Sequence, residues 1–348
     1  MKQASSTVRN AQDRPHPVHL LICDDSIFMR MAIRTLCEED PRIVVIGEAR
    51  DGAEAIEAVR TLQPDVVTMD VDMPGVDGAS ATERIVRESE IPVIMLSGIN
   101  RSRSALTDHL LECGAVDVIW KSASMMDIDI GGVAQTIIEK VLFWGQKPAN
   151  PGPYPAGDPQ DGAQAHDVVL LSLGDGGPHA VAAALGEPVA GTAPIIVAAD
   201  IPMACMDGFM RRLGRVTGLP VTHVEDGTAL HHDNIYVVPG TARLRLKREG
   251  DEMSFHPDPA AAPLSNNSAF STTQVMLANA GMTALIVLLS GGRPTMQAMK
   301  LSAARGARIL VQSPDTCVSS AGFAEVLADV ESAKAATPGE IRRILGMR

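Results

Sequence analysis

Short apolar runs alternate with helical patterns along the first part of the chain. From Val18 to about Gly145, five runs rich in β-branched residues read as strands: VHLLIC, IVVIGEA, DVVTMD, PVIMLSG and AVDVIW. Strands that alternate with helices are typical of a parallel sheet that is covered by helices. The pattern therefore predicts a five-stranded, doubly wound α/β domain over residues 18–145, preceded by an N-terminal tail of residues 1–17.

A second α/β pattern follows a segment that shows neither the helical nor the strand period of apolar residues. Residues 146–166 are crowded with Pro, Gly and Ala, which predicts an interdomain linker. Six further strand candidates come after it: DVVLLSL, PIIVAAD, PVTHVE, NIYVVPG, TALIVLLSGG and ARILVQS. A small antiparallel piece is expected near RLRLKREGDEMSFH. We therefore predict a larger α/β domain over residues 167–348.

Composition narrows the classes of function. The formal charge of -12 opposes attraction to phosphate backbones, and an aromatic content of 3% offers little for base stacking, so nucleic-acid binding is not expected. Cysteines number 5 and have no CxxC spacing, which predicts reduced thiols rather than a metal or redox motif. No apolar run is long enough to span a bilayer, so we expect a cytoplasmic protein without membrane insertion.

Polar residues follow the predicted strands of the first domain. Asp24 and Asp25 come directly after the first strand, and Asp70 ends the third; Ser97 and Lys121 end the fourth and fifth. The ends of parallel strands meet at one edge of a sheet, so these side chains should share a pocket. Clustered carboxylates suit Mg²⁺. The set predicts a phosphoryl site with Asp70 as nucleophile, whereas the alternative is that each acid only caps a helix or sits in a solvated loop.

The motifs LICDDSIFMR, TMDVDMPGVDG, VIMLSG and GAVDVIWK resemble a response-regulator receiver domain. The resemblance covers the whole first domain. It implies phosphotransfer from a partner histidine kinase to Asp70. It also implies that Mg²⁺ is held by Asp25, Asp70 and the backbone carbonyl of Asp72, with assistance from Asp24.

The second domain opens with a strand that runs into a glycine turn, VVLLSLGDGGPHAV. This turn and the stretches PIIVAADIP, VEDGTALHHDNIYVVPGTARL and LIVLLSGG resemble the chemotaxis protein-glutamate methylesterases, which are hydrolases controlled by a receiver domain. The catalytic residues of that family do not carry over. The resemblance implies that this chain has Gly174 at the position of the family's serine nucleophile and Asp200 at that of the histidine base. Pro294 or Thr295 stands at the position of the orienting aspartate.

Two hypotheses follow for the second domain. The preferred one is a phosphorylation-switched output domain without esterase chemistry that acts by protein interaction, docked on the receiver domain in one state and separated in the other. The alternative is an active methylesterase or glutamine deamidase that acts on chemoreceptors through a rearranged site. Its candidate residues, all near the glycine turn, are Ser172, His179, Asp175 and Asp200. Ser172 and His179 are also interpreted as a strand serine and a residue of the first helical turn. A transcription regulator is disfavoured, because the charge is acidic and no helix-turn-helix is apparent.

Two further segments have alternative interpretations. His223 to Asp233, HVEDGTALHHD, contains enough His and carboxylate for a metal, but its spacing favours a surface loop. Met203, Met206 and Met210 have helical spacing, which favours core packing over a partner groove.

Overall fold

The computed structural model describes most of the chain, and the element bounds below lie within these residues. The described ranges are 16–89, 91–98, 113–121, 131–146, 166–174, 177–188, 191–199, 206–239, 244–249, 252–257, 281–292 and 294–347. The predicted tail and linker therefore lie almost entirely outside the described residues. The domain boundaries drawn through them stay predictions.

The first sheet has five parallel strands in the order β2-β1-β3-β4-β5, as the strand–helix alternation predicts. The strands are β1 (Val18–Cys23), β2 (Ile43–Ala49), β3 (Val66–Asp70), β4 (Val93–Gly98) and β5 (Asp117–Lys121). The helices around them are α1 (Ile27–Glu38), α2 (Gly52–Leu62), α3 (Gly78–Ser89) and α5 (Gly131–Trp144). Capping by Ser26 and Asp51 starts α1 and α2, because each side chain accepts a hydrogen bond from a first-turn backbone N–H.

The second sheet has seven strands in the order β14-β13-β12-β6-β7-β9-β8, and all of its pairings are parallel. Its strands are β6 (Val168–Leu173), β7 (Ile195–Ala199), β8 (Val221–His223), β9 (Ile235–Pro239), β12 (Ala284–Leu288), β13 (Arg308–Gln312) and β14 (Ala333–Ala336). The helices are α6 (Gly177–Ala184), α7 (Met206–Thr217), α9 (Met296–Ala304), α10 (Phe323–Asp329) and α11 (Pro338–Ile344). Two apolar clusters cover its two faces, as expected for a buried sheet.

The six strands that the sequence predicts for this sheet are present, and the predicted antiparallel piece is the hairpin of β10 (Leu244–Glu249) and β11 (Glu252–Pro257). Strand β14 was not predicted, because its sequence AKAA has little intrinsic preference for a strand. The methionine stripe is core where it is described, because Met206 is buried and Met210 packs against the same cluster. Met203 lies outside the described residues.

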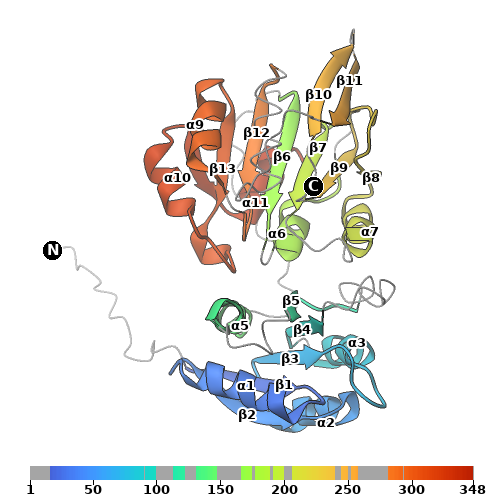
Figure 1. The fold of residues 1–348 in the computed structure, drawn as a ribbon, viewed down its shortest axis with the longest axis vertical. Helices are drawn as coiled ribbons and strands as arrows, with labels where there is room; N and C mark the ends of the chain where they lie inside the picture. Colours follow the sequence, from blue (N-terminus) through green and yellow to red (C-terminus); the bar gives the residue numbers. More distant parts are fainter. Residues whose placement is uncertain are drawn as a thin grey trace, which may run out of the picture.

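The end of α5 and strand β5 of the first domain lie nearest to α6 and α7 of the second (Figure 1). The rings of Trp144 in α5 and His179 in α6 meet edge to face, with centroids 4.6 Å apart. Val118 of β5 packs against the apolar cluster of the second sheet. Burial and the neighbouring Arg215 lower the pKa of Arg212 in α7, while the charge of Asp117 across the domain boundary opposes this shift. The two domains are therefore in direct contact through these elements.

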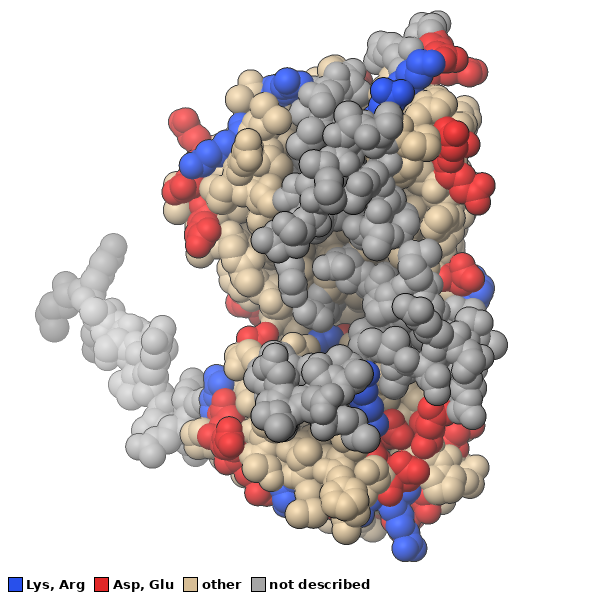
Figure 2. Space-filling model, in the orientation of Figure 1, with Lys and Arg blue, Asp and Glu red and all other residues tan. Residues whose placement is uncertain are grey.

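Acidic and basic side chains are interspersed over the described parts of the face in Figure 2, where no continuous basic patch is visible. Within the described residues, no helix combines the length and the apolar character needed to cross a membrane. The cysteines of the described ranges, Cys23, Cys37, Cys113 and Cys317, are buried and form no disulfide.

Candidate functional site: an acidic pocket and a glycine turn

Three carboxylates meet at the carboxyl edge of the first sheet. Asp24 and Asp25 follow β1 and Asp70 ends β3, and each offers an oxygen atom within 4.8 Å of the others. The parallel register of β1 and β3 brings these strand ends together, with Cys23 beside Met69. Asp24 and Asp70 are buried, whereas Asp25 is exposed and leaves the cluster open to solvent. A set of three carboxylates fits a hard divalent cation such as Mg²⁺.

Lys121 supplies the opposite charge from the end of β5. Its Nζ lies 2.8 Å from Asp24 Oδ2 and 2.6 Å from Asp70 Oδ1. Burial raises the pKa of Asp70 to about 6; Lys121 opposes this shift, and the charges of Asp24 and Asp25 add to it. Burial also acts to lower the pKa of Lys121, but Asp70 and Asp24 outweigh it and raise the pKa. The cluster is thus a pocket of excess negative charge that the lysine offsets in part.

Asp24 is held in place from several sides. Its Oδ1 accepts a hydrogen bond of 2.9 Å from the backbone N–H of Ser26, which also caps α1. Its backbone carbonyl accepts one of 2.8 Å from Arg30, whose guanidinium pairs with Glu48 of β2. Since both carboxylate oxygens of Asp24 already have partners, Asp25 and Asp70 are the acids with more freedom to bind a cation. Sequence reasoning missed the support from Arg30, because it depends on a partner in another strand.

Ser97 and Asp72 complete the predicted set. Ser97 is buried on β4, next to the residue that pairs with Asp70, and Gly98 after it pairs with Lys121. Asp72 is exposed in the loop after β3. This loop turns back tightly, because a Cβ on Gly78 would lie 1.9 Å from the carbonyl oxygen of Asp70. The residues predicted from the strand ends therefore lie around one pocket, while their chemical roles stay predictions.

The glycine turn of the second domain has no room for a side chain at its first position. Gly174 is buried, and its N–H donates to the carbonyl of Ser290 at 3.1 Å. A Cβ on Gly174 would lie 2.3 Å from the carbonyl oxygen of Gly291 and 2.9 Å from its carbonyl carbon. Real Cβ atoms do not approach backbone this closely, so even an alanine would force the two segments apart. Asp200 and the neighbouring Asp175 lie outside the described residues, and Pro294 is partly buried.

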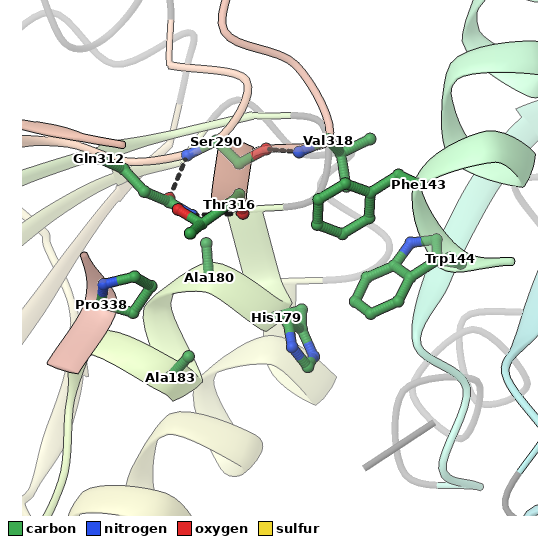
Figure 3. A pocket seen from close by; sticks show the side chains of 10 residues that line it. All are labelled: Phe143, Trp144, His179, Ala180, Ala183, Ser290, Gln312, Thr316, Val318 and Pro338. Carbon is green, nitrogen blue, oxygen red and sulfur yellow. Dashed lines mark hydrogen bonds between the residues drawn. The ribbon is translucent and has the colours of Figure 1, made fainter. Parts of the chain in front are cut away.

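Ser172 and His179, the two candidates for a rearranged catalytic site, lie in different surroundings. Ser172 is buried inside β6 and is flanked by Leu288 and Ala198 of the neighbouring strands. His179 lies in the first turn of α6, with its ring directed toward Trp144 (Figure 3). Ser172 is therefore a strand serine, and His179 is a residue of the first helical turn that contacts the receiver domain.

A pocket lies between the two domains, at the carboxyl edge of the second sheet. Phe143 and Trp144 of α5 line it from the first domain, opposite His179, Ser290 and Gln312 of the second (Figure 3). Hydrogen bonds fix the side of the pocket that the second domain provides. The backbone N–H of Ser290 donates to Gln312 Oε1 at 2.9 Å, and Ser290 Oγ accepts from the N–H of Val318 at 3.0 Å. Open α/β folds bind ligands at this edge. Here the end of α5 covers it.

Comparisons with known proteins agree with this layout. Residues 20–129 match the family described as Response regulator receiver domain, and residues 169–345 match the family described as CheB methylesterase. A protein-glutamate methylesterase/protein-glutamine glutaminase 2 from Nitratidesulfovibrio vulgaris is 32% identical over 92% of this chain and 98% of its own. The chain belongs to the CheB methylesterase family.

A second relative in this family, a protein-glutamate methylesterase/protein-glutamine glutaminase 1 from Oleidesulfovibrio alaskensis, is 30% identical over 90% of this chain and 96% of its own. Among solved structures, the response regulator domain of Thermotoga maritima CheB is 35% identical, covers 38% of this chain and 98% of its own, and has a TM-score of 0.35. The two family matches show that this chain combines a response-regulator receiver domain with a CheB-family output domain.

Proposed function

We propose that this CheB-family chain is a response regulator that accepts a phosphoryl group on Asp70 and signals through an output domain that has lost the methylesterase chemistry of the family. The chemistry of the acidic pocket supports the first part. Asp70 is the nucleophile, while Lys121 offsets charge on the incoming phosphoryl group and Ser97 donates a hydrogen bond to it. Asp25, Asp70 and the carbonyl of Asp72 would hold Mg²⁺, with assistance from Asp24. When bound, Mg²⁺ supplies positive charge that lets an anionic donor approach three carboxylates.

The phosphodonor that fits this site is a histidine kinase, as the receiver domain implies, and the resemblance to the chemotaxis methylesterases makes a chemoreceptor the expected output partner. We infer a cytoplasmic protein, in keeping with these partners. The open, exposed side of the pocket at Asp25 provides the access that a protein donor requires.

The loss of esterase chemistry is supported above all by the carbonyl oxygen of Gly291, which lies 2.3 Å from where a side chain at position 174 would begin. A nucleophile needs a base within hydrogen-bond reach and a group that orients the base. The family resemblance expects the nucleophile, the base and the orienting group at three positions. This chain has Gly174, Asp200, and Pro294 or Thr295 there. Backbone donors that remain in such a site supply only a small part of a hydrolase's rate.

Phosphorylation is proposed to act on the contact between the domains. Strand β5 carries Lys121 at its end and Asp117 at its start, and Asp117 accepts hydrogen bonds from Lys140 at 2.8 Å and from Trp144 Nε1 at 3.2 Å. A new charge on Asp70 attracts Lys121 and thereby moves β5. Asp117 of this strand is hydrogen-bonded to Trp144, which contacts His179 of the output domain. The receiver and output domains would then be docked in one state and separated in the other.

A methanol-release assay on methylated chemoreceptors separates this proposal from the active alternative, which the relatives' names favour. We expect no methanol above background from the phosphorylated protein, while the Nitratidesulfovibrio vulgaris relative serves as the positive control. Methanol release that disappears in Ser172→Ala or His179→Ala would show a rearranged methylesterase site and would refute the proposal. Release of ammonia from receptor glutamines, lost in the same variants, would show a rearranged deamidase site and would refute it as well.

A further inference from the structure

A Ser-His-Asp hydrogen-bond chain lies on the hairpin of the output domain, outside the glycine turn. Ser254 Oγ lies 2.9 Å from His256 Nε2, and His256 Nδ1 lies 2.8 Å from Asp226 Oδ1. Ser254 and His256 are two residues apart in β11, so their side chains emerge on the same face of the strand. Asp226 belongs to the HVEDGTALHHD segment, whose role the sequence left open between a metal site and a surface loop.

The turn that carries Asp226 is fixed to β11 by backbone hydrogen bonds. Gly227 N–H donates to the carbonyl of Phe255, and Phe255 N–H donates to the carbonyl of Thr228, both at 2.8 Å. Phe255 is fully buried on the inner face of the hairpin and contacts the ring of Tyr236. The three polar residues thus stand on a framework that the protein core holds in place, which is what a reactive constellation requires.

The chemistry of the partners fixes how protons are distributed along the chain. An ionised carboxylate only accepts hydrogen bonds, so the Nδ1 of His256 carries a proton that it donates to Asp226. In a neutral imidazole the Nε2 is then an acceptor, and the hydroxyl of Ser254 donates to it. A hydroxyl that donates to an imidazole, itself oriented by a carboxylate, is the arrangement that activates a serine nucleophile.

Two cations share this face. Arg245 pairs with His256 and Lys247 pairs with Ser254 across the hairpin, and cross-strand neighbours lie about 5 Å apart at Cβ. Both residues are exposed, as is Asp226, and Ser254 and His256 are partly exposed. The face is therefore open to solvent, which suits a small ester. It also carries Glu252 and Glu249, and Glu249 pairs with Lys247. Arg245 is then the cation of this face that can offset the negative charge that develops on the ester's carbonyl oxygen.

We propose that Ser254, His256 and Asp226 form a nucleophilic site that hydrolyses small, unhindered carboxylic esters, independently of the glycine turn and of the proposed function. Ser254 Oγ attacks the carbonyl carbon while its proton passes to His256 Nε2. The C–O bond to the alcohol breaks, and the alcohol leaves with that proton. Water then attacks the acyl-serine, giving its proton to His256, which returns it to Ser254 as the acid is released. Asp226 holds the imidazole in the required tautomer throughout.

Labelling of the full-length protein with a fluorophosphonate probe, together with hydrolysis of p-nitrophenyl acetate, tests the proposal. We expect one covalent adduct on Ser254 by peptide mass mapping, with fluoride displaced by Oγ. Ser254→Ala and His256→Gln should both abolish labelling, and Asp226→Asn should slow it by on the order of 10²-fold or more. Ser332→Ala is the matched control, because Ser332 is an exposed serine in a turn of the same domain. It should label like the wild type.

The thermal unfolding of each variant is measured alongside, since these side chains lie on the outer face and their replacement should leave the fold intact. Ser254→Cys provides a second route: a thiolate activated by His256 should react with iodoacetamide at least tenfold faster than the same thiol in the His256→Gln background. The proposal is overturned if folded Ser254→Ala labels and hydrolyses ester as the wild type does, if the wild type gives no adduct on Ser254, or if the thiol reacts equally in both backgrounds.

Discussion

Replacing Lys140 by methionine should destabilise the receiver domain, because it leaves a buried carboxylate without its cation. Lys140 is 1% exposed and Asp117 is 5% exposed. Their charged atoms lie 2.8 Å apart. Removing one partner of a buried ion pair costs about 3–5 kcal/mol. We therefore expect the free energy of unfolding to fall by about 3–5 kcal/mol.

Urea unfolding followed by tryptophan fluorescence measures the loss, because both tryptophans, Trp120 and Trp144, belong to the receiver domain.

The double variant Asp117→Asn with Lys140→Met is the control. The amide carries no charge and keeps an oxygen that can accept the hydrogen bond from Trp144 Nε1. It should recover at least about 2 kcal/mol of the loss in the single variant. A single variant that loses less than about 1 kcal/mol, or a double variant whose loss equals the sum of the single ones, would refute the reasoning.

Three further predictions concern phosphorylation, the glycine turn and the domain contact. Acetyl phosphate with Mg²⁺ should shift the wild type on a phosphate-affinity gel, and both EDTA and Asp70→Asn should remove the shift; a shifted variant would contradict Asp70 as the acceptor. Gly174→Ser should lower the stability by about 1–3 kcal/mol in thermal unfolding and release no methanol, because the carbonyl of Gly291 occupies the space of the new side chain. Trp144→Ala should increase the radius of gyration in small-angle scattering, as phosphorylation of the wild type should; unchanged profiles in both would count against a switched domain contact.

The sequence by itself determined the two sheets and most of the acidic pocket. Strand and helix periods report which face of an element is buried, and consecutive strands in a parallel sheet all end at the same edge. That rule is enough to bring Asp24, Asp70 and Lys121 together from positions far apart in the chain. The sequence also shows the glycine turn, and the family resemblance identifies the residues at the positions of the family's triad.

Only the tertiary structure decided which partners the remaining side chains meet. The carbonyl of Gly291 over Gly174, the buried pair of Lys140 and Asp117, and the contact of Asp226 with His256 each join separate elements. Strand β14 was missed for the same reason, since AKAA becomes a strand through its pairing with β13. Hydrophobic periodicity fixes the orientation of a segment but carries no information on the distance between two segments, which depends on how all the layers pack together.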